Sequence, residues 1–208
     1  MTKAPAEKGS KPADRRPSRE DAEAAVRTLI AWAGDDPDRP GLAETPQRVA
    51  SAYQEFFRGY REDPLAVLAD CVFEHVGGYD DLVILRDIRV ESHCEHHIVP
   101  FIGRAHVAYL PRGRVAGLSR LARAVEILAK RLQTQEALTA EIADAIEQGL
   151  SPRGIGVVME AEHQCMASRG VHQWGAAAVT TRFRGVLETD TSLRDRFLAL
   201  VTAPRGGR

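Results

Sequence analysis

The chain has little cysteine, with three residues in 208. Three thiols cannot make the paired disulfide framework of a small secreted domain, and we predict that Cys71 is a small buried side chain rather than a ligand. No apolar run approaches the length of a membrane span, and no apolar signal region accompanies the basic N-terminus. These absences predict a soluble, cytoplasmic protein that has no membrane partner.

An excess of one charge is also missing, because the formal net charge at pH 7 is -1. The composition therefore gives no overall attraction to nucleic acid, and any polyanionic ligand must be bound by a local group of arginines. Internal repeats and low-complexity core segments are absent too. A chain of 208 residues, 44% of them hydrophobic, can instead bury one substantial core.

The composition divides the chain into four predicted regions. A basic tail rich in Pro, Ala and Ser has no apolar periodicity, and we expect it to be disordered because it cannot offset the entropy lost on ordering. Two helix starts follow, a capping box at Ser18–Asp21 and the pair Thr45-Pro46. The predicted boundaries are a tail at 1–17, an N-terminal helical region at 18–75, a main domain that carries the chemistry at 76–203, and a flexible C-terminus at 204–208.

The hydrophobic pattern of the main domain changes period twice. Alternating or β-branched runs predict strands at 82–90, 102–110, 155–161 and 176–183. Between the second and third strands, apolar residues at helical spacing predict one helix through 121–132 and another through 138–146, joined by the polar residues 133–135. A short helix is predicted at 192–201. The order strand-strand-helix-helix-strand-strand indicates the α+β class.

The best zinc-binding side chains are concentrated at two places. Residues 91–97 read ESHCEHH and residues 163–165 read HQC, so these segments contain two of the three cysteines and four of the seven histidines. Thiolate and imidazole are the preferred ligands of Zn²⁺, and a Cys-x-x-His spacing lets two side chains reach one ion across a turn. The sequence therefore predicts a zinc site.

The ligand count decides whether that metal is catalytic or structural. Cys94, His97 and Cys165 leave one tetrahedral position for water, whereas a closed site also needs His96 or His163. Neighbouring residues of a strand point to opposite sides, which argues against His96 and His97 on one ion, and His163 and Cys165 share a face if their segment is a strand. Free imidazoles beside a metal favour hydrolytic chemistry. Buried thiols with satisfied histidines, and a purely structural zinc, stay open as alternatives.

Several motifs resemble GTP cyclohydrolase I in the order and spacing of that family. They are CEHHIVPFIG at 94–103, GLSRLAR at 117–123, RLQTQE at 131–136, EHQCM at 162–166 and RGV at 169–171, and the likeness covers about residues 19–202. The resemblance implies a zinc-dependent enzyme that converts GTP and water into 7,8-dihydroneopterin triphosphate and formate, the first step of pterin and folate biosynthesis. It also implies the tunnelling fold, in which antiparallel sheets of several subunits close into a barrel, and a decamer of two pentamers with active sites at subunit interfaces.

The resemblance implies a role for each catalytic residue. Zinc is held by Cys94, His97 and Cys165, with a water as fourth ligand whose pKa the ion lowers. His163 is the proton donor to N7 of guanine, because an imidazole titrates near neutral pH. The later rearrangement needs an acid and base near the ribose, a role given to His96, with Ser119 as an auxiliary hydrogen-bonding group.

Substrate recognition is assigned to other positions of the same motifs. Glu136 with Gln135 is matched to guanine, because a carboxylate accepts hydrogen bonds from N1–H and the 2-amino group together. Arg123 and Arg169, supported by Arg120, are matched to the triphosphate, which demands cations with a forked geometry.

The chain departs from the family pattern at two places. Residue 120 is arginine where the family commonly has lysine, and residues 172–175 read HQWG where a lysine is usual. Arg120 keeps the charge but presents different donors, which affects affinity and the selectivity for GTP over GDP. His172 supplies part of the missing charge or is only a surface residue.

Two other classes of protein compete with this interpretation. A zinc-dependent base deaminase needs a Pro-Cys-x-x-Cys pair after its His-x-Glu element, and the chain has no Cys-x-x-Cys. A zinc-stabilised oligomeric module without activity would use His96 or His163 as the fourth metal ligand.

Overall fold

The computed structural model describes residues 16–69, 72–74 and 79–203, and the chain divides into two compact units, 1–55 and 56–208. The predictions for Cys71, for nearly all of the tail at 1–17 and for the C-terminus at 204–208 fall outside the described residues. The predicted domain boundaries stay predictions. No helix in the described ranges is long and apolar enough to cross a membrane.

The first unit begins with the predicted capping box. Helix α1 (Arg19–Trp32) follows Ser18, whose hydroxyl accepts the backbone N–H of Asp21 (3.1 Å) while the Asp21 carboxylate accepts the backbone N–H of Ser18 (2.9 Å). These reciprocal bonds satisfy two backbone donors at the start of the helix. Helix α2 (Thr45–Phe56) has Pro46 in its first turn, where proline costs no helical hydrogen bond.

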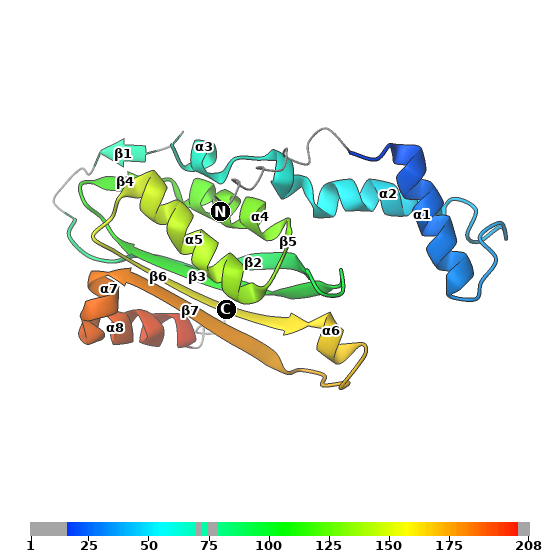
Figure 1. The fold of residues 1–208 in the computed structure, drawn as a ribbon. Helices are drawn as coiled ribbons and strands as arrows, with labels where there is room; N and C mark the ends of the chain where they lie inside the picture. Colours follow the sequence, from blue (N-terminus) through cyan, green and yellow to red (C-terminus); the bar gives the residue numbers. More distant parts are fainter. Residues whose placement is uncertain (1–15, 70–71, 75–78, 204–208) are drawn as a thin grey trace, which may run out of the picture. The chain divides into compact units, whose positions relative to one another are not determined.

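The second unit is built on a five-stranded sheet (Figure 1). Its strands are β2 (Val83–Cys94), β3 (Pro100–Leu110), β5 (Leu132–Gln133), β6 (Gly154–His163) and β7 (Ala177–Gly185), in the order β5-β2-β3-β6-β7. All neighbours are antiparallel except β2 and β5. The short strands β1 (Val72–Glu74) and β4 (Arg114–Ala116) pair separately.

Helices cover both faces of this sheet (Figure 1). Helices α4 (Leu118–Ala129) and α5 (Gln135–Leu150) lie on one face, together with α3 (Pro64–Ala69), and bury the larger apolar core. Helices α7 (Val186–Thr189) and α8 (Thr191–Thr202) lie on the other, where Phe197 is fully buried in a second core. A 3-10 turn, η2 (Arg58–Arg61), precedes α3, and a one-turn helix, α6 (Gln164–Ala167), follows β6.

The α+β class predicted from the sequence is confirmed. The strand predicted at 82–90 continues to Cys94, because residues 88–93 pair in register with β3. Sequence reasoning missed β5, which begins at the last residue of the helix predicted through 121–132 and ends in the predicted join. The helix itself, α4, ends at Ala129. Strand β5 has only two residues and forms because they pair in parallel with the end of β2. Since β2 is distant in sequence, no local pattern of residues predicts this strand.

Candidate active site

The first half of the candidate metal centre is the tight connection between β2 and β3. Cys94 ends β2, its N–H donates to the carbonyl of Val99 (2.9 Å), and its carbonyl accepts the N–H of Ile98 (2.8 Å). Ile98 has φ 55°, a left-handed conformation that reverses the chain within a few residues. The turn brings Nδ1 of His97 to 3.9 Å and Nδ1 of His96 to 3.6 Å from Sγ of Cys94.

The second half comes from the end of β6. Strand β3 pairs with β6 so that Phe101 lies opposite His163, which places the end of β6 beside the β2–β3 turn. The condition under which His163 and Cys165 would share a face, that both belong to one strand, is not met. The strand ends at His163, and Cys165 lies in the helical turn α6, which packs against β3.

Cys94, His97 and Cys165 form a group that could hold a metal ion. Their ligand atoms all lie within 4.8 Å of one another. Two sulfurs and an imidazole nitrogen suit zinc, and two atoms bound to one tetrahedral zinc ion are roughly 3.3–3.8 Å apart. Burial, and next the nearby Cys94, raise the pKa of the Cys165 thiol. A cation bound between the two sulfurs would stabilise them as thiolates, so the two sulfurs and the imidazole fit a zinc ion.

His163 is held rigidly beside this group. Its ring stacks on Phe101 with centroids 4.7 Å apart and an angle of 9° between the planes. Nε2 of the ring lies 2.8 Å from Oε1 of Gln135. Burial lowers the pKa of His163, and the charge of Glu136 opposes that shift.

Gln135 lies where a substrate cannot reach its amide. The residue is 1% exposed, and its Nε2 donates to Met159 O, Ala178 O and Thr180 Oγ1 while Oε1 faces His163. Every hydrogen-bonding group of this side chain therefore has a partner inside the protein. The amide is therefore already engaged within the protein, and the predicted role of Gln135 with Glu136 in binding guanine stays a prediction.

Glu136, by contrast, is exposed on the next position of α5. It lines a cavity of about 220 Å³ together with Thr139, Ala140, Thr180, Thr181 and Arg182. The carboxylate is thus open to a ligand, and hydroxyl groups from α5 and β7 lie in the same cavity.

Arg169 adjoins the metal-binding group, and its Nη1 lies 3.0 Å from Nε2 of His97. The side chain follows α6 directly and is exposed. A guanidinium only donates, so this contact uses the lone pair of His97 Nε2 and leaves Nδ1 as the atom that faces Cys94.

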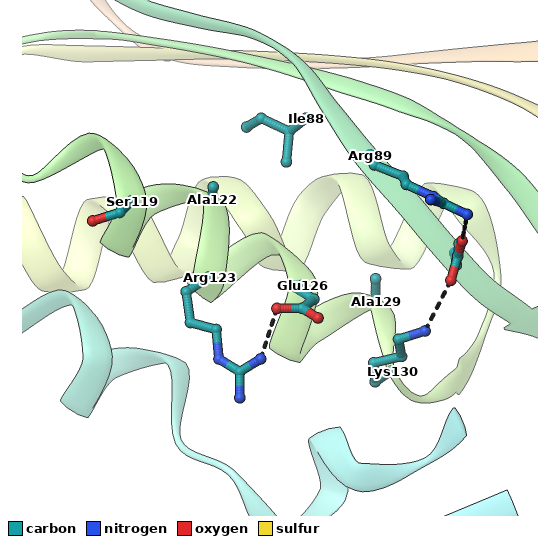
Figure 2. A pocket seen from close by; sticks show the side chains of 9 residues that line it. Ile88, Arg89, Ser119, Ala122, Arg123, Glu126, Ala129 and Lys130 are labelled. Carbon is teal, nitrogen blue, oxygen red and sulfur yellow. Dashed lines mark hydrogen bonds and ion pairs between the residues drawn. The ribbon is translucent and has the colours of Figure 1, made fainter. Parts of the chain in front are cut away.

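Ser119 and Arg123 lie in a larger cavity of about 500 Å³, shown in Figure 2. Its lining consists of Ile88, Arg89, Glu91, Ser119, Ala122, Arg123, Glu126, Ala129 and Lys130. None of the three metal-binding residues is among them. The predicted site residues thus lie in separate groups within the described chain. Arg120 belongs to α4, the helix that carries Ser119 and Arg123, and is half-buried.

Carboxylates already engage the cations of the larger cavity. Arg123 donates to Glu126 (2.7 Å) and to Glu62 (2.7 Å), and these bonds, that to Glu126 first, raise its pKa. Figure 2 also shows Lys130 reaching toward β2, where its Nζ lies 3.3 Å from Glu91. Sequence reasoning missed Glu126 and Lys130, although their spacing of three and seven residues from Arg123 places all three on one side of a helix.

A family profile and highly similar curated sequences point to one family. A profile described as GTP cyclohydrolase I matches residues 22–202. Proteins named GTP cyclohydrolase 1 are 61% identical over 184 residues in Hyphomonas neptunium (88% of this chain, 89% of that protein) and 58% identical over 185 residues in Brucella anthropi (89% and 86%). Among solved structures, the archaeosine synthase QueF-Like in its apo form is 20% identical, with a TM-score of 0.44 over 51% of this chain and 96% of that chain.

Proposed function

The chain belongs to the GTP cyclohydrolase I family of enzymes, and from this premise we propose that it is a zinc-dependent, cytoplasmic enzyme that converts GTP and water into 7,8-dihydroneopterin triphosphate and formate. This product makes it the entry step of pterin and folate biosynthesis. The observation that carries the zinc proposal is the convergence of Cys94, His97 and Cys165 from two separate turns. The test is to incubate the purified protein with GTP and to follow formate and the fluorescent oxidised pterin. A protein that binds zinc and releases neither compound would contradict the proposal.

Zinc in this site would be held by Cys94, His97 and Cys165. When bound, the ion supplies Lewis acidity and lowers the pKa of a water that it coordinates. Side chains of the protein are proposed to carry out the proton transfers. His163, whose ring is immobilised against Phe101, is proposed to donate a proton to N7 of guanine, which makes C8 more electrophilic.

His96 is proposed to serve the later rearrangement of the ribose. Its side chain is exposed beside the metal-binding group, so it can reach a ligand bound there. Ring opening and release of formate precede this stage, and an exposed imidazole can then act as both acid and base during the proton shift. Ser119 is proposed to assist by hydrogen bonding.

Glu136 is proposed to select guanine, because its exposed carboxylate can accept N1–H and the 2-amino group together. The substitution Glu136→Gln replaces one acceptor by a donor that faces the donors of guanine. We expect GTP binding to weaken by about 2–4 kcal/mol. Calorimetry with GTP and with inosine triphosphate, which lacks the 2-amino group, measures this effect. An unchanged Kd for GTP would show that Glu136 does not contact the base.

Arg123 and Arg169 are proposed to bind the triphosphate, with support from Arg120. The bonds from Arg123 to Glu62 and Glu126 mean that a triphosphate must share or displace two carboxylates. Such competition favours ligands of high negative charge, because a weakly charged anion cannot replace two charge-assisted hydrogen bonds to carboxylates.

A ring-shaped homo-oligomer, a decamer of two pentamers whose sheets close into the barrel of the tunnelling fold, is proposed to complete each active site. Two observations support this. The cavity with Ser119 and Arg123 excludes the metal-binding residues, and β7 pairs only with β6 within the described chain, so its outer edge is open. Such an edge is a template for another strand. Light scattering tests the assembly, and a stable monomer with full activity would refute it.

A further inference from the structure

The amide of Gln135 can adopt only one orientation. Its Nε2 lies 3.3 Å from Met159 O and 3.0 Å from Ala178 O. An amide nitrogen donates and never accepts, so the nitrogen must face these two carbonyl oxygens. The flipped amide would place its own oxygen against both of them. Oε1 therefore points to His163.

Two threonine hydroxyls close a directed ring of hydrogen bonds around this amide. Nε2 of Gln135 donates to Thr180 Oγ1 (3.1 Å), Oγ1 of Thr180 lies 2.7 Å from Oγ1 of Thr139, and the Thr139 hydroxyl donates to the backbone carbonyl of Gln135 (2.7 Å). Each hydroxyl has one proton to donate, so the direction of every bond in the ring follows. Gln135 and Thr139 are 1% and 2% exposed, and Thr180 is half-buried, so most of this ring is shielded from water.

This orientation determines where His163 carries its proton. Oε1 of Gln135 only accepts, and Nε2 of His163 lies 2.8 Å from it, so Nε2 is the N–H of the ring. In a neutral imidazole the lone pair is then on Nδ1. The stack on Phe101 fixes the plane of the ring and hence the direction in which Nδ1 points.

We propose that Gln135 is a positioning residue, which fixes the tautomer and the orientation of His163 so that Nδ1 exchanges the proton with the substrate. The catalytic importance of Gln135 rests on the proposed function, whereas the tautomer of His163 follows from the hydrogen bonds alone. Gln135 thus acts through His163 and does not recognise guanine. Partners that orient an imidazole in this way typically change activity by about 10–100-fold when they are removed.

The chain offers a matched control in Gln133. This second buried glutamine is 5% exposed, and its Nε2 donates to Ser92 Oγ, Leu128 O and Ala129 O. Its Oε1 has no partner in the described structure, and in particular no histidine. Gln133→Met therefore disturbs a similar buried amide without touching His163.

The experiment is ¹⁵N NMR of the zinc-loaded full chain labelled at histidine, at a pH roughly two units above the usual histidine pKa. His163→Gln assigns the signal. In the unmodified protein we expect His163 with its proton on Nε2; Gln135→Met should mix the two tautomers, and Gln133→Met should leave them unchanged. A proton on Nδ1 in the unmodified protein would overturn the proposal, even where Gln135→Met fails to fold.

Kinetics with GTP distinguish a role of Gln135 in positioning His163 from a role in binding guanine. We expect Gln135→Met to lower kcat for formate release about 10–100-fold with KM unchanged. A raised KM with normal kcat would instead assign Gln135 to guanine binding and overturn the proposal. Failure of the proposed function has a different signature, because the unmodified protein would then show no turnover of GTP while the tautomer of His163 is as expected.

Discussion

Replacing Cys165 by alanine is expected to remove both the bound zinc and the turnover of GTP. Two remaining ligands, Cys94 and His97, hold zinc poorly, since affinity depends on a complete set of deprotonated donors. Cys94→Ala and His97→Ala should behave alike. Metal content by mass spectrometry and formate release measure the two effects together, and Cys71→Ala is the matched thiol control, which should keep both.

A variant that retains less than about a tenth of its zinc but full activity would defeat the catalytic role of the metal. X-ray absorption of the zinc protein distinguishes an open site from a closed one. Two sulfurs, one nitrogen and one light oxygen indicate the open site, whereas two sulfurs and two nitrogens indicate that His96 or His163 is a fourth ligand.

The two imidazoles near the metal-binding group are expected to fail at different stages. His163→Ala should block ring opening and lower formate release by about 10²–10⁴-fold, because the proton transfer to N7 of guanine that activates C8 is lost. His96→Ala should still release some formate while failing to form the pterin. Formate and pterin fluorescence, measured separately on each variant, report the two stages.

His172→Ala is the control for this pair, because His172 is an exposed histidine on the loop after α6. It should leave both stages close to normal. Equal losses at both stages in His163→Ala and His96→Ala would discard the division of roles between them.

Local features of the sequence determined the turn between two metal ligands and the buried side of α4. The spacing of Cys94 and His97 specifies a turn that brings two ligands together, and the structure closes that turn with Ile98. The apolar period of 121–128 specifies the buried side of α4, and the structure buries Leu121, Val125 and Leu128. Interactions between residues a few positions apart fix these features, so one chain segment is sufficient to predict them.

The tertiary structure decided which side chains can meet a ligand. Gln135 and Glu136 are adjacent, yet the first is buried against His163 and the second is open to a cavity, because β6 and β7 pack against the side of α5 that carries Gln135. In the same way, Cys165 reaches the metal-binding group through the helical turn after β6, and Arg123 meets Glu62 from another element. Burial and long-range pairing arise from the packing of distant segments, which no local pattern of residues records.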